Sequence, residues 1–300
     1  MKVNRIRQNL LPLLTAMIWG TAFVAQSVGA EYMGAFTFNT ARAVIAFLFL
    51  LGLCGVMSLL RRRGGKRSMT RSRRDLVTGG LCCGTALAVA SYFQQKGLET
   101  TTAGKAGFVT ALYIVLVPII GRALGRRVPR TVWFSVALAV AGLYCLCMNE
   151  SMTMTVGDLF LLACALCFSV QILVVDHFSQ RVDGVELSCV QFLVMAVLSA
   201  FGMATETLPP LADLSAYLWP VLYVGVFSSG VAYTLQILSQ KDADPAVVSL
   251  LMSLESVFAT IAGVLILRDH MSGREYLGCF LMLAAVILAQ LPDRRVKPVS

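Results

Sequence analysis

Charged residues are scarce in this chain, and their scarcity excludes an ordinary soluble fold. Only 14% of the 300 residues are Asp, Glu, Lys or Arg, whereas soluble domains contain roughly 25%. Hydrophobic residues make up 57% and recur in long runs from Leu10 to Leu291, with only short polar gaps between the runs. A soluble fold of this length could not bury so much apolar surface. The solvent around most of the chain must therefore be lipid.

Histidine and the usual catalytic motifs are also lacking. His177 and His270 are the only histidines, which argues against a His/Cys metal centre, so we expect neither a metal nor another cofactor. Neither G-x-S-x-G nor H-E-x-x-H occurs, and Glu255 is the one carboxylate clearly in the middle of an apolar run. We therefore assign no catalytic residue and expect no enzyme, although an enzyme embedded in the membrane stays the alternative from another class.

The nine cysteines and the net charge of +9 have plain explanations. All nine cysteines lie within apolar segments, including the C-x-x-C of Cys164 and Cys167, so they are interpreted as small packing residues and not as a redox pair. The basic residues form short caps between apolar runs and not a face with interleaved aromatics. This pattern argues against a nucleic-acid partner and is typical of the loops of a membrane protein.

Ten runs are long enough to cross a bilayer as helices, which need roughly 20 residues each. Lipid leaves the backbone no water to bond with, so helix is the state expected for every run. The first run could pass for a signal peptide, but it has the length of a retained span. The ten expected spans are Leu10–Ala30, Phe36–Leu60, Leu76–Leu98, Ala103–Leu124, Thr131–Met148, Leu159–Val175, Val185–Ala204, Ala216–Leu238, Pro245–Leu267 and Ser272–Leu291.

The distribution of basic residues predicts the orientation of these spans. If the N-terminus lies inside, 20 of the 25 Lys and Arg residues fall on the inner side and four fall outside. Lysine and arginine favour cytoplasmic loops, so both termini are expected in the cytoplasm. The richest inner stretch, between the second and third spans, could alternatively bind anionic lipid or nucleic acid, but a role in setting the topology is favoured.

A weak internal repeat divides the chain into two halves. Ala90–Gln95 aligns with Val231–Gln236, so that Tyr and Gln recur three residues apart in both, and Trp19 aligns with Phe168. We expect one five-helix repeat over residues 1–150 and a second over residues 151–300. Because five is odd, the two repeats have inverted topology, as in carriers that work by alternating access. Gly80 with Gly84 and Gly121 with Gly125 give small-residue faces for helix packing.

Several short motifs resemble the EamA-type family of the drug/metabolite transporter superfamily. Ala16–Gly20 resembles its A-x-x-W-G pattern, and Arg42 is similar to the arginine of its second span. Ala103–Pro118 is similar to the fourth span of one bacterial branch, and Leu254–Phe258 resembles the L-E-P-V-F of the ninth. Ser256 stands where the family has proline, which puts a proline-made break of the ninth helix in doubt.

The resemblance implies a secondary transporter of small metabolites, such as amino acids, related polar solutes or drugs. It also implies an exporter in the inner membrane of a bacterium, with a small-molecule substrate and membrane lipid as partners. A channel is the second alternative, which the inverted halves disfavour. The sequence leaves open whether the protein forms a homodimer.

The residues expected to bind substrate are polar or aromatic groups within spans. A charged group in a span costs about 2.5 to 3.5 kcal/mol, so Glu255 in the ninth span is the first candidate for proton coupling or for a substrate amine. The alternative role for Glu255 is that of a structural carboxyl inside the helix bundle. The full set of expected substrate-binding residues is Trp19, Tyr92, Gln95, Lys105, Tyr113, Tyr233, Gln236 and Glu255.

Two further expectations concern charge and flexibility. Arg42 and Lys105 lie in outer parts of spans, where a long side chain could instead reach the interface. Pro118 and Gly121 can break the fourth helix and act as a hinge. Interhelical hydrogen bonding by Tyr92, Gln95, Tyr233 and Gln236 is the alternative to a shared binding cavity.

Overall fold

A computed structural model gives the fold of the chain and describes residues 2–63, 72–101, 103–147, 155–210, 213–241, 243–262 and 272–291. Every regular element in these ranges is a helix. The expected all-α fold is therefore confirmed for the described residues. The arginine-rich stretch at 64–71 and residues 263–267 of the ninth run lie outside the described ranges.

The helices follow the expected runs closely. The first half holds α1 (Lys2–Tyr32), α2 (Ala35–Arg63), α3 (Arg73–Leu98), α4 (Ala103–Ala111), α5 (Tyr113–Ala123) and α6 (Arg130–Cys147). The second half holds α7 (Val156–Ser179), α8 (Gly184–Met203), α9 (Leu214–Tyr223), the π-helix η2 (Val224–Ala232), α10 (Tyr233–Gln240), α11 (Pro245–Met252), α12 (Glu255–Ala262) and α13 (Gly273–Gln290).

Nine stretches of the described chain are long and apolar enough to cross a membrane, and Arg130–Cys145 of α6 is a shorter apolar helix. The fourth span combines α4 with α5, the eighth combines α9, η2 and α10, and the ninth combines α11 with α12. Polar residues cap the starts of several helices. Thr155 with Asp158 and Ser272 with Glu275 form capping boxes, which satisfy backbone N–H groups at the starts of α7 and α13.

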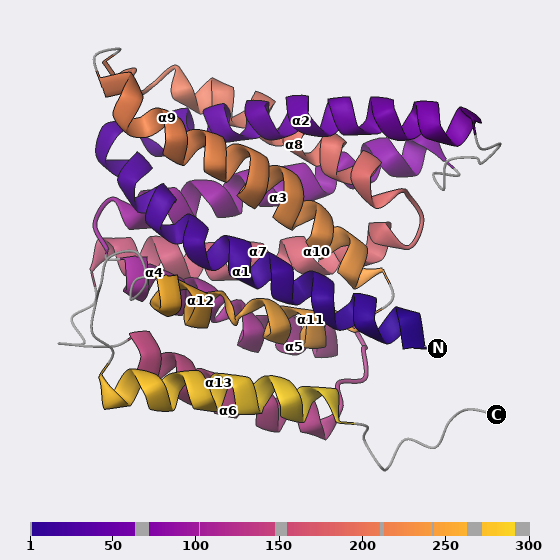
Figure 1. Cartoon of the computed structure of the whole chain (residues 1–300), viewed down its shortest axis with the longest axis vertical. Helices are drawn as coiled ribbons and strands as arrows, with labels where there is room; N and C mark the ends of the chain where they lie inside the picture. The colour runs from indigo at the N-terminus through magenta and orange to yellow at the C-terminus, as the bar shows by residue number, and fades with distance from the viewer. Residues whose placement is uncertain are drawn as a thin grey trace.

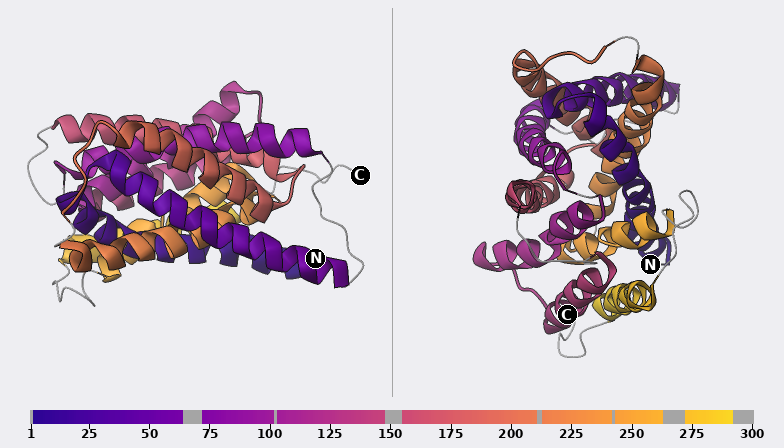
Figure 2. Two further views of the ribbon diagram at one scale, coloured as in Figure 1. Left: turned by 90° about the horizontal axis from the view of Figure 1, so that it is seen from above. Right: turned by 90° about the vertical axis from the view of Figure 1, so that its left-hand side faces the viewer.

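The helices lie side by side and run along one common direction (Figures 1 and 2). The start of α1 and the end of α13 lie on the same side of the molecule, and α6 and α13 form a pair along one edge (Figure 1). At the opposite edge α2 packs on α8, and α1 crosses between these two pairs. The middle of the bundle is therefore built mainly from the first, third, fourth, sixth, eighth and ninth spans.

Helix contacts occur in matched sets across the two halves. The third span (α3) packs on the sixth (α7), and the eighth (α9, η2, α10) packs on the first (α1). In the same way α4 and α5 contact α7, while α11 and α12 contact α1. The second span packs on the seventh, and the fifth packs on the tenth. Exchanging the two halves turns each of these pairs into itself.

The fourth and ninth spans are both interrupted near their middles. In the fourth span the interruption lies at Leu112, between α4 and α5, and not at Pro118 or Gly121, which both lie inside α5. The break of the fourth helix thus precedes Pro118 by six residues. A hinge at Pro118 and Gly121 stays a prediction. The N–H groups of Leu112 and Val115 bond three residues back, to Val109 and Leu112, in a tightened turn.

The ninth span breaks without a proline. α11 ends at Met252 and α12 begins at Glu255. The Ser253 hydroxyl donates to the Leu250 carbonyl at 2.8 Å, and the Leu254 N–H bonds Leu251, three residues back, at 3.3 Å. The serine thus occupies the carbonyl that a regular helix would give to Leu254. The ninth span is therefore interrupted although Ser256 stands in the place of the family proline, and the interruption coincides with the Ser253 hydrogen bond.

Glycines set how closely several helices approach. A Cβ on Gly84 would lie 2.6 Å from the Gln191 carbonyl, so α3 and α8 touch through that face, as expected. The second expected face is different. Gly125 has nothing within 4 Å and a φ of 83°, so it ends the segment after α5 in a left-handed turn instead of packing helices.

Candidate functional site: a polar cavity between the two halves

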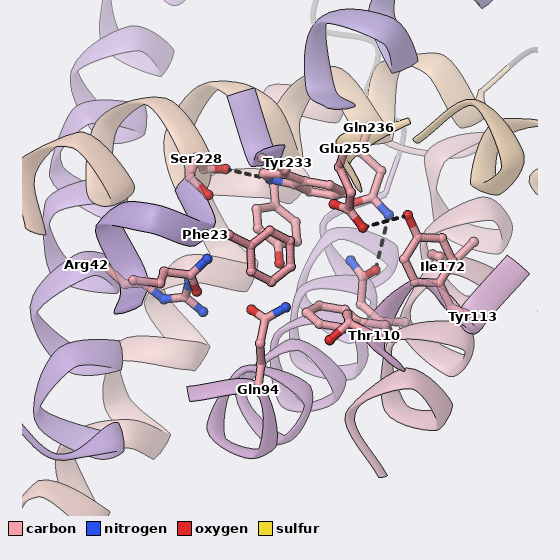
Figure 3. Close-up of a pocket in the computed structure, with 14 residues that line it drawn as sticks. Phe23, Arg42, Gln94, Thr110, Tyr113, Ile172, Ser228, Tyr233, Gln236 and Glu255 are labelled. Atoms are coloured by element: carbon pink, nitrogen blue, oxygen red, sulfur yellow. Dashed lines mark hydrogen bonds between the residues drawn. The ribbon is translucent and has the colours of Figure 1, made fainter. Parts of the chain in front are cut away.

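A cavity in the middle of the bundle receives side chains from both halves of the chain (Figure 3). α1, α2, α3, α4 and α5 contribute from the first half, and α7, η2, α10 and α12 from the second. Its walls combine aromatic rings, side-chain amides, one guanidinium and one carboxyl. They are Trp19, Phe23, Gln26, Arg42, Gln94, Thr110, Tyr113, Phe168, Gln171, Ile172, Ser228, Tyr233, Gln236 and Glu255.

The free space in the cavity is small. About 30 Å³ is open to the centre of a water-sized molecule, which is enough for one or two waters, since a single water needs at least 10 to 15 Å³. Binding sites for drug-sized molecules are commonly hundreds of cubic ångströms in volume. A metabolite could therefore enter only after the walls have moved apart.

Glu255 and Tyr113 meet where the two interrupted spans come together. Tyr113 is the first residue of α5 and Glu255 is the first residue of α12, so each follows the interruption of its own span. The Tyr113 hydroxyl donates to Glu255 Oε1 at 3.2 Å (Figure 3). Both side chains are buried, with Glu255 only 3% exposed. The hydrogen bond thus joins the two halves of the chain at the cavity wall.

Trp19 lies against the π-helical part of the eighth span. Its indole N–H donates to the Ser228 carbonyl at 3.2 Å, and its ring lies 4.7 Å from the ring of Tyr233, centroid to centroid (Figure 3). Four residues earlier, the Thr15 hydroxyl donates to the Ala232 carbonyl at 3.2 Å. Two α1 side chains therefore bind carbonyls of the irregular segment, as a membrane-buried backbone requires.

Tyr233 and Gln236 both reach the cavity, as expected for the eighth span. The Gln236 amide donates to Gln171 Oε1 at 3.2 Å (Figure 3). The Tyr233 ring contacts the Phe192 ring edge-on at 5.6 Å. Gln236 Oε1 and Gln171 Nε2 are buried with no hydrogen-bond partner among the described residues, so each amide keeps polar capacity for a bound solute.

Tyr92 and Gln95, their counterparts in the third span, lie elsewhere. Tyr92 stacks on Phe36 with ring centroids 4.3 Å apart, and Gln95 donates to the Gln26 carbonyl at 3.0 Å. Neither lines the cavity, and Gln94 lines it instead. The physical reason is a difference in winding. α3 is regular, whereas η2 gives the eighth span a π turn, and one extra residue rotates the following side chains by about 100°.

The remaining expected residues are placed as follows. Lys105 falls on α4, but its side chain is outside the described part of the chain. Pro118 and Gly121 are buried in α5, beyond the cavity wall. The structure therefore brings together Trp19, Tyr113, Tyr233, Gln236 and Glu255 from the expected set.

The sequence reasoning assigned no substrate contact to several wall residues. Arg42 was interpreted mainly as structural, yet it is only 2% exposed and lines the cavity. The internal repeat gave a sequence signal for three other wall residues, Phe23, Phe168 and Ile172. The register that aligns Trp19 with Phe168 also aligns Phe23 with Ile172, and all four line the cavity. Gln26, Gln94 and Gln171 gave no comparable signal, because isolated glutamines in apolar runs more often bond neighbouring helices.

Comparison with known proteins places this architecture among membrane transporters. The sequence model of the EamA-like transporter family matches the chain twice, over residues 7–148 and 155–291. An uncharacterized transporter of Archaeoglobus fulgidus is 32% identical over 292 residues, which cover 96% of this chain and 87% of that protein. An uncharacterized transporter of Synechocystis sp. is 23% identical over 95% of this chain and 90% of its own length.

A solved structure shares the fold. A crystal structure titled only as that of a protein superposes with a TM-score of 0.77 at 19% sequence identity, covering 94% of this chain and 96% of the other. At this identity the likeness concerns the arrangement of helices alone. The multi-pass helical fold and a role in membrane transport follow from these findings together.

Proposed function

Because the chain belongs to the EamA-like transporter family, we propose that it is a secondary carrier that moves small metabolites by alternating access between two inverted five-helix halves. Residues 1–150 form one half and residues 151–300 the other. The solutes are amino acids or related polar molecules, drugs among them. The carrier works as an exporter in the cytoplasmic membrane of a bacterium, with both termini in the cytoplasm.

The observation that carries the proposal is the meeting of the two interrupted spans at the cavity. Tyr113 and Glu255 occupy the same place in the fourth and ninth spans, and they bond each other across the two halves. Interrupted helices in corresponding positions of two repeats are typical of carrier binding sites. The matched contacts of the third with the sixth span and of the eighth with the first support the same two-fold arrangement.

The small volume of the cavity favours a carrier over a channel. A channel needs a continuous polar path, and its gate opens that path to both sides. Here the polar side chains surround a space of about 30 Å³. A solute of metabolite size fits only if one half moves relative to the other, which is the step that alternating access supplies.

Glu255 is proposed to couple transport to protons. Among the described residues it is the one carboxyl that lines the cavity, and its hydrogen-bond partner there is a tyrosine hydroxyl and not a cation. A carboxyl in that setting can take up a proton in one state of the carrier and release it in the other. Trp19, Tyr113, Tyr233 and Gln236 would then contact the solute beside it.

The experiment that tests the proposal is uptake into proteoliposomes. Labelled amino acids and other metabolites are supplied with and without an imposed pH gradient, and accumulation is measured. The wild type should concentrate at least one solute when the gradient is present. Glu255→Gln keeps size and hydrogen bonding but cannot titrate, so gradient-driven accumulation should be lost while exchange of solute across the membrane continues.

Glu99→Gln is the matched control, since Glu99 is an exposed carboxyl at the end of α3 that pairs with Lys96. This variant should accumulate solute as the wild type does. Accumulation by Glu255→Gln with unchanged dependence on pH, at normal abundance in the vesicles, would show that Glu255 is structural. If the wild type moves no solute of the panel, carrier function itself is contradicted.

A further inference from the structure

The Arg42 guanidinium is a buried cation inside the cavity. Arg42 lies on α2, its side chain points into the cavity beside Phe23 and Gln94 (Figure 3), and only 2% of its surface is exposed. Its guanidinium is thus enclosed by neighbouring side chains and is not exposed at the surface of the protein. Arginine stays protonated in proteins, so this end of the cavity carries a positive charge.

No carboxylate of the described chain forms an ion pair with this cation. The described contacts of Arg42 are with neutral groups: Gln26 Oε1 accepts a hydrogen bond at 3.2 Å, and the Phe38 ring lies 6.0 Å from the guanidinium carbon. Arg42 Nε is buried and has no hydrogen-bond partner among the described residues. Glu255, the carboxyl in the same cavity, bonds Tyr113 instead. The guanidinium therefore keeps an unused N–H donor and forms no ion pair with a carboxylate of the described residues.

An uncompensated buried charge is costly, and an anion brought in by a ligand removes the cost. A guanidinium offers a planar fork of N–H groups, which matches the two oxygens of a carboxylate. The rest of the wall is suited to an organic body. Trp19, Phe23 and Phe168 supply apolar rings, and Gln94 and Gln171 supply amides.

We propose that Arg42 binds the carboxylate of the transported solute, so that the carrier accepts organic carboxylates and zwitterions and rejects solutes that carry only positive charge. This inference rests on the proposed function and narrows its substrate class. With the carboxylate on Arg42, Glu255 is left to receive either a substrate ammonium group or a proton. In both cases the charges within the cavity sum to zero, which favours passage through the bilayer interior.

Matched solutes test the contribution of the carboxylate to binding separately from that of the ammonium group and the side chain. Phenylalanine carries both charges, N-acetylphenylalanine carries only the carboxylate, and phenylalanine amide carries only the ammonium group. The same three derivatives of leucine and alanine vary the apolar body. Each solute is titrated against the purified protein in nanodiscs of neutral lipid, and binding is measured from the rise in unfolding temperature. Inorganic phosphate and an anionic lipid serve as alternative sources of negative charge.

The acids should bind and the amides should bind at least about tenfold more weakly, because a charge-assisted hydrogen bond is lost. Arg42→Gln should weaken the acids by about 10- to 100-fold and leave the amides unchanged. Arg42→Lys keeps the charge without the fork, so it should still prefer acids, at reduced affinity. Arg63→Gln removes an exposed arginine of the same helix and should behave as the wild type.

Several results would overturn the assignment. They are amides that bind as well as acids, acids unaffected by Arg42→Gln, no carboxylate that binds at all, or displacement of the acids by anionic lipid. The preference of the wild type for acids is decisive even if Arg42→Gln does not fold. Failure here is separable from failure of carrier function, because a carrier that moves amides into proteoliposomes would still be a carrier.

Discussion

At the scale of single residues, Gly20 shows how a small side chain serves the cavity. It follows Trp19 on α1 and faces the start of α12, where a Cβ would lie 2.5 Å from the Glu255 carbonyl and 2.8 Å from the Ala259 nitrogen. Those neighbours are backbone atoms, which cannot turn aside as a flexible side chain could. The glycine therefore lets α1 approach the half-helix that presents Glu255, as small residues do in membrane helix contacts.

Gly20→Ala should destabilise the protein. Inserting one methyl group against packed backbone typically costs about 1 to 3 kcal/mol, which should appear as a lower unfolding temperature in detergent. Gly52→Ala is the matched control, because nothing lies within 4 Å of its added Cβ. At that site alanine should stabilise the helix by about 0.5 to 1 kcal/mol. Equal unfolding temperatures for the two variants would contradict the close approach of α1 to α12.

At the scale of secondary-structure elements, the interruption of the ninth span coincides with a serine hydrogen bond. Ser253 donates to the Leu250 carbonyl and so displaces the regular bond from the Leu254 N–H. Ser253→Ala frees that carbonyl, so the helix should continue through this point and the unfolding temperature should rise. The exchange rate of a transported solute in proteoliposomes should fall by about tenfold, since a barrier increase of 1.4 kcal/mol has that effect.

Ser249→Ala supplies the comparison for this variant. The Ser249 hydroxyl also bonds a carbonyl three residues back, that of Ala246, but it does so within the continuous part of α11. Its removal should leave transport close to that of the wild type. If both variants transport equally well, the serine-made interruption has no part in the transport cycle.

The helices could be predicted from the sequence because each depends on a long apolar run, but the irregular turns could not. The sequence around Val224–Ala232 has the same apolar character as a regular span, and the π-helix that it forms packs against α1 and α2. A Cβ on Gly225, for example, would lie 2.7 Å from the Ile45 side chain. Such contacts join distant parts of the chain, so no local sequence pattern predicts them.

The same limit explains which site residues could be predicted. Glu255 was evident because a carboxyl inside an apolar run is rare and costly. Tyr92 was placed by assuming that the two repeats wind alike, and the π segment breaks that equivalence. Arg42 could be interpreted as a residue that reaches the interface, because the sequence gives no measure of how deeply α2 is packed. Depth and helix rotation are properties of the assembled bundle.

At the scale of the whole molecule, two ion pairs and the two ends of the helical bundle bear on the predicted orientation. Arg61 at the end of α2 pairs with Asp183 at 2.7 Å, and Arg126 after α5 pairs with Asp176 at 2.6 Å. These residues lie at the ends of spans for which the count of basic residues predicts a cytoplasmic position. The start of α1 and the end of α13 lie on the same side as each other (Figure 1), as an even number of spans requires.

The proposed inverted arrangement of the two halves predicts the side of every loop. Reporters fused after Arg67, Arg127 and Ser300 should be cytoplasmic, whereas reporters fused after Thr155 and Asp213 should be external. The measurement uses paired fusions to alkaline phosphatase, which is active outside, and to green fluorescent protein, which is fluorescent inside. An external Ser300 would remove one crossing and contradict ten spans. A cytoplasmic Thr155 would give the first half an even number of crossings, so that the second half would run in the same direction and could not be its inverted copy.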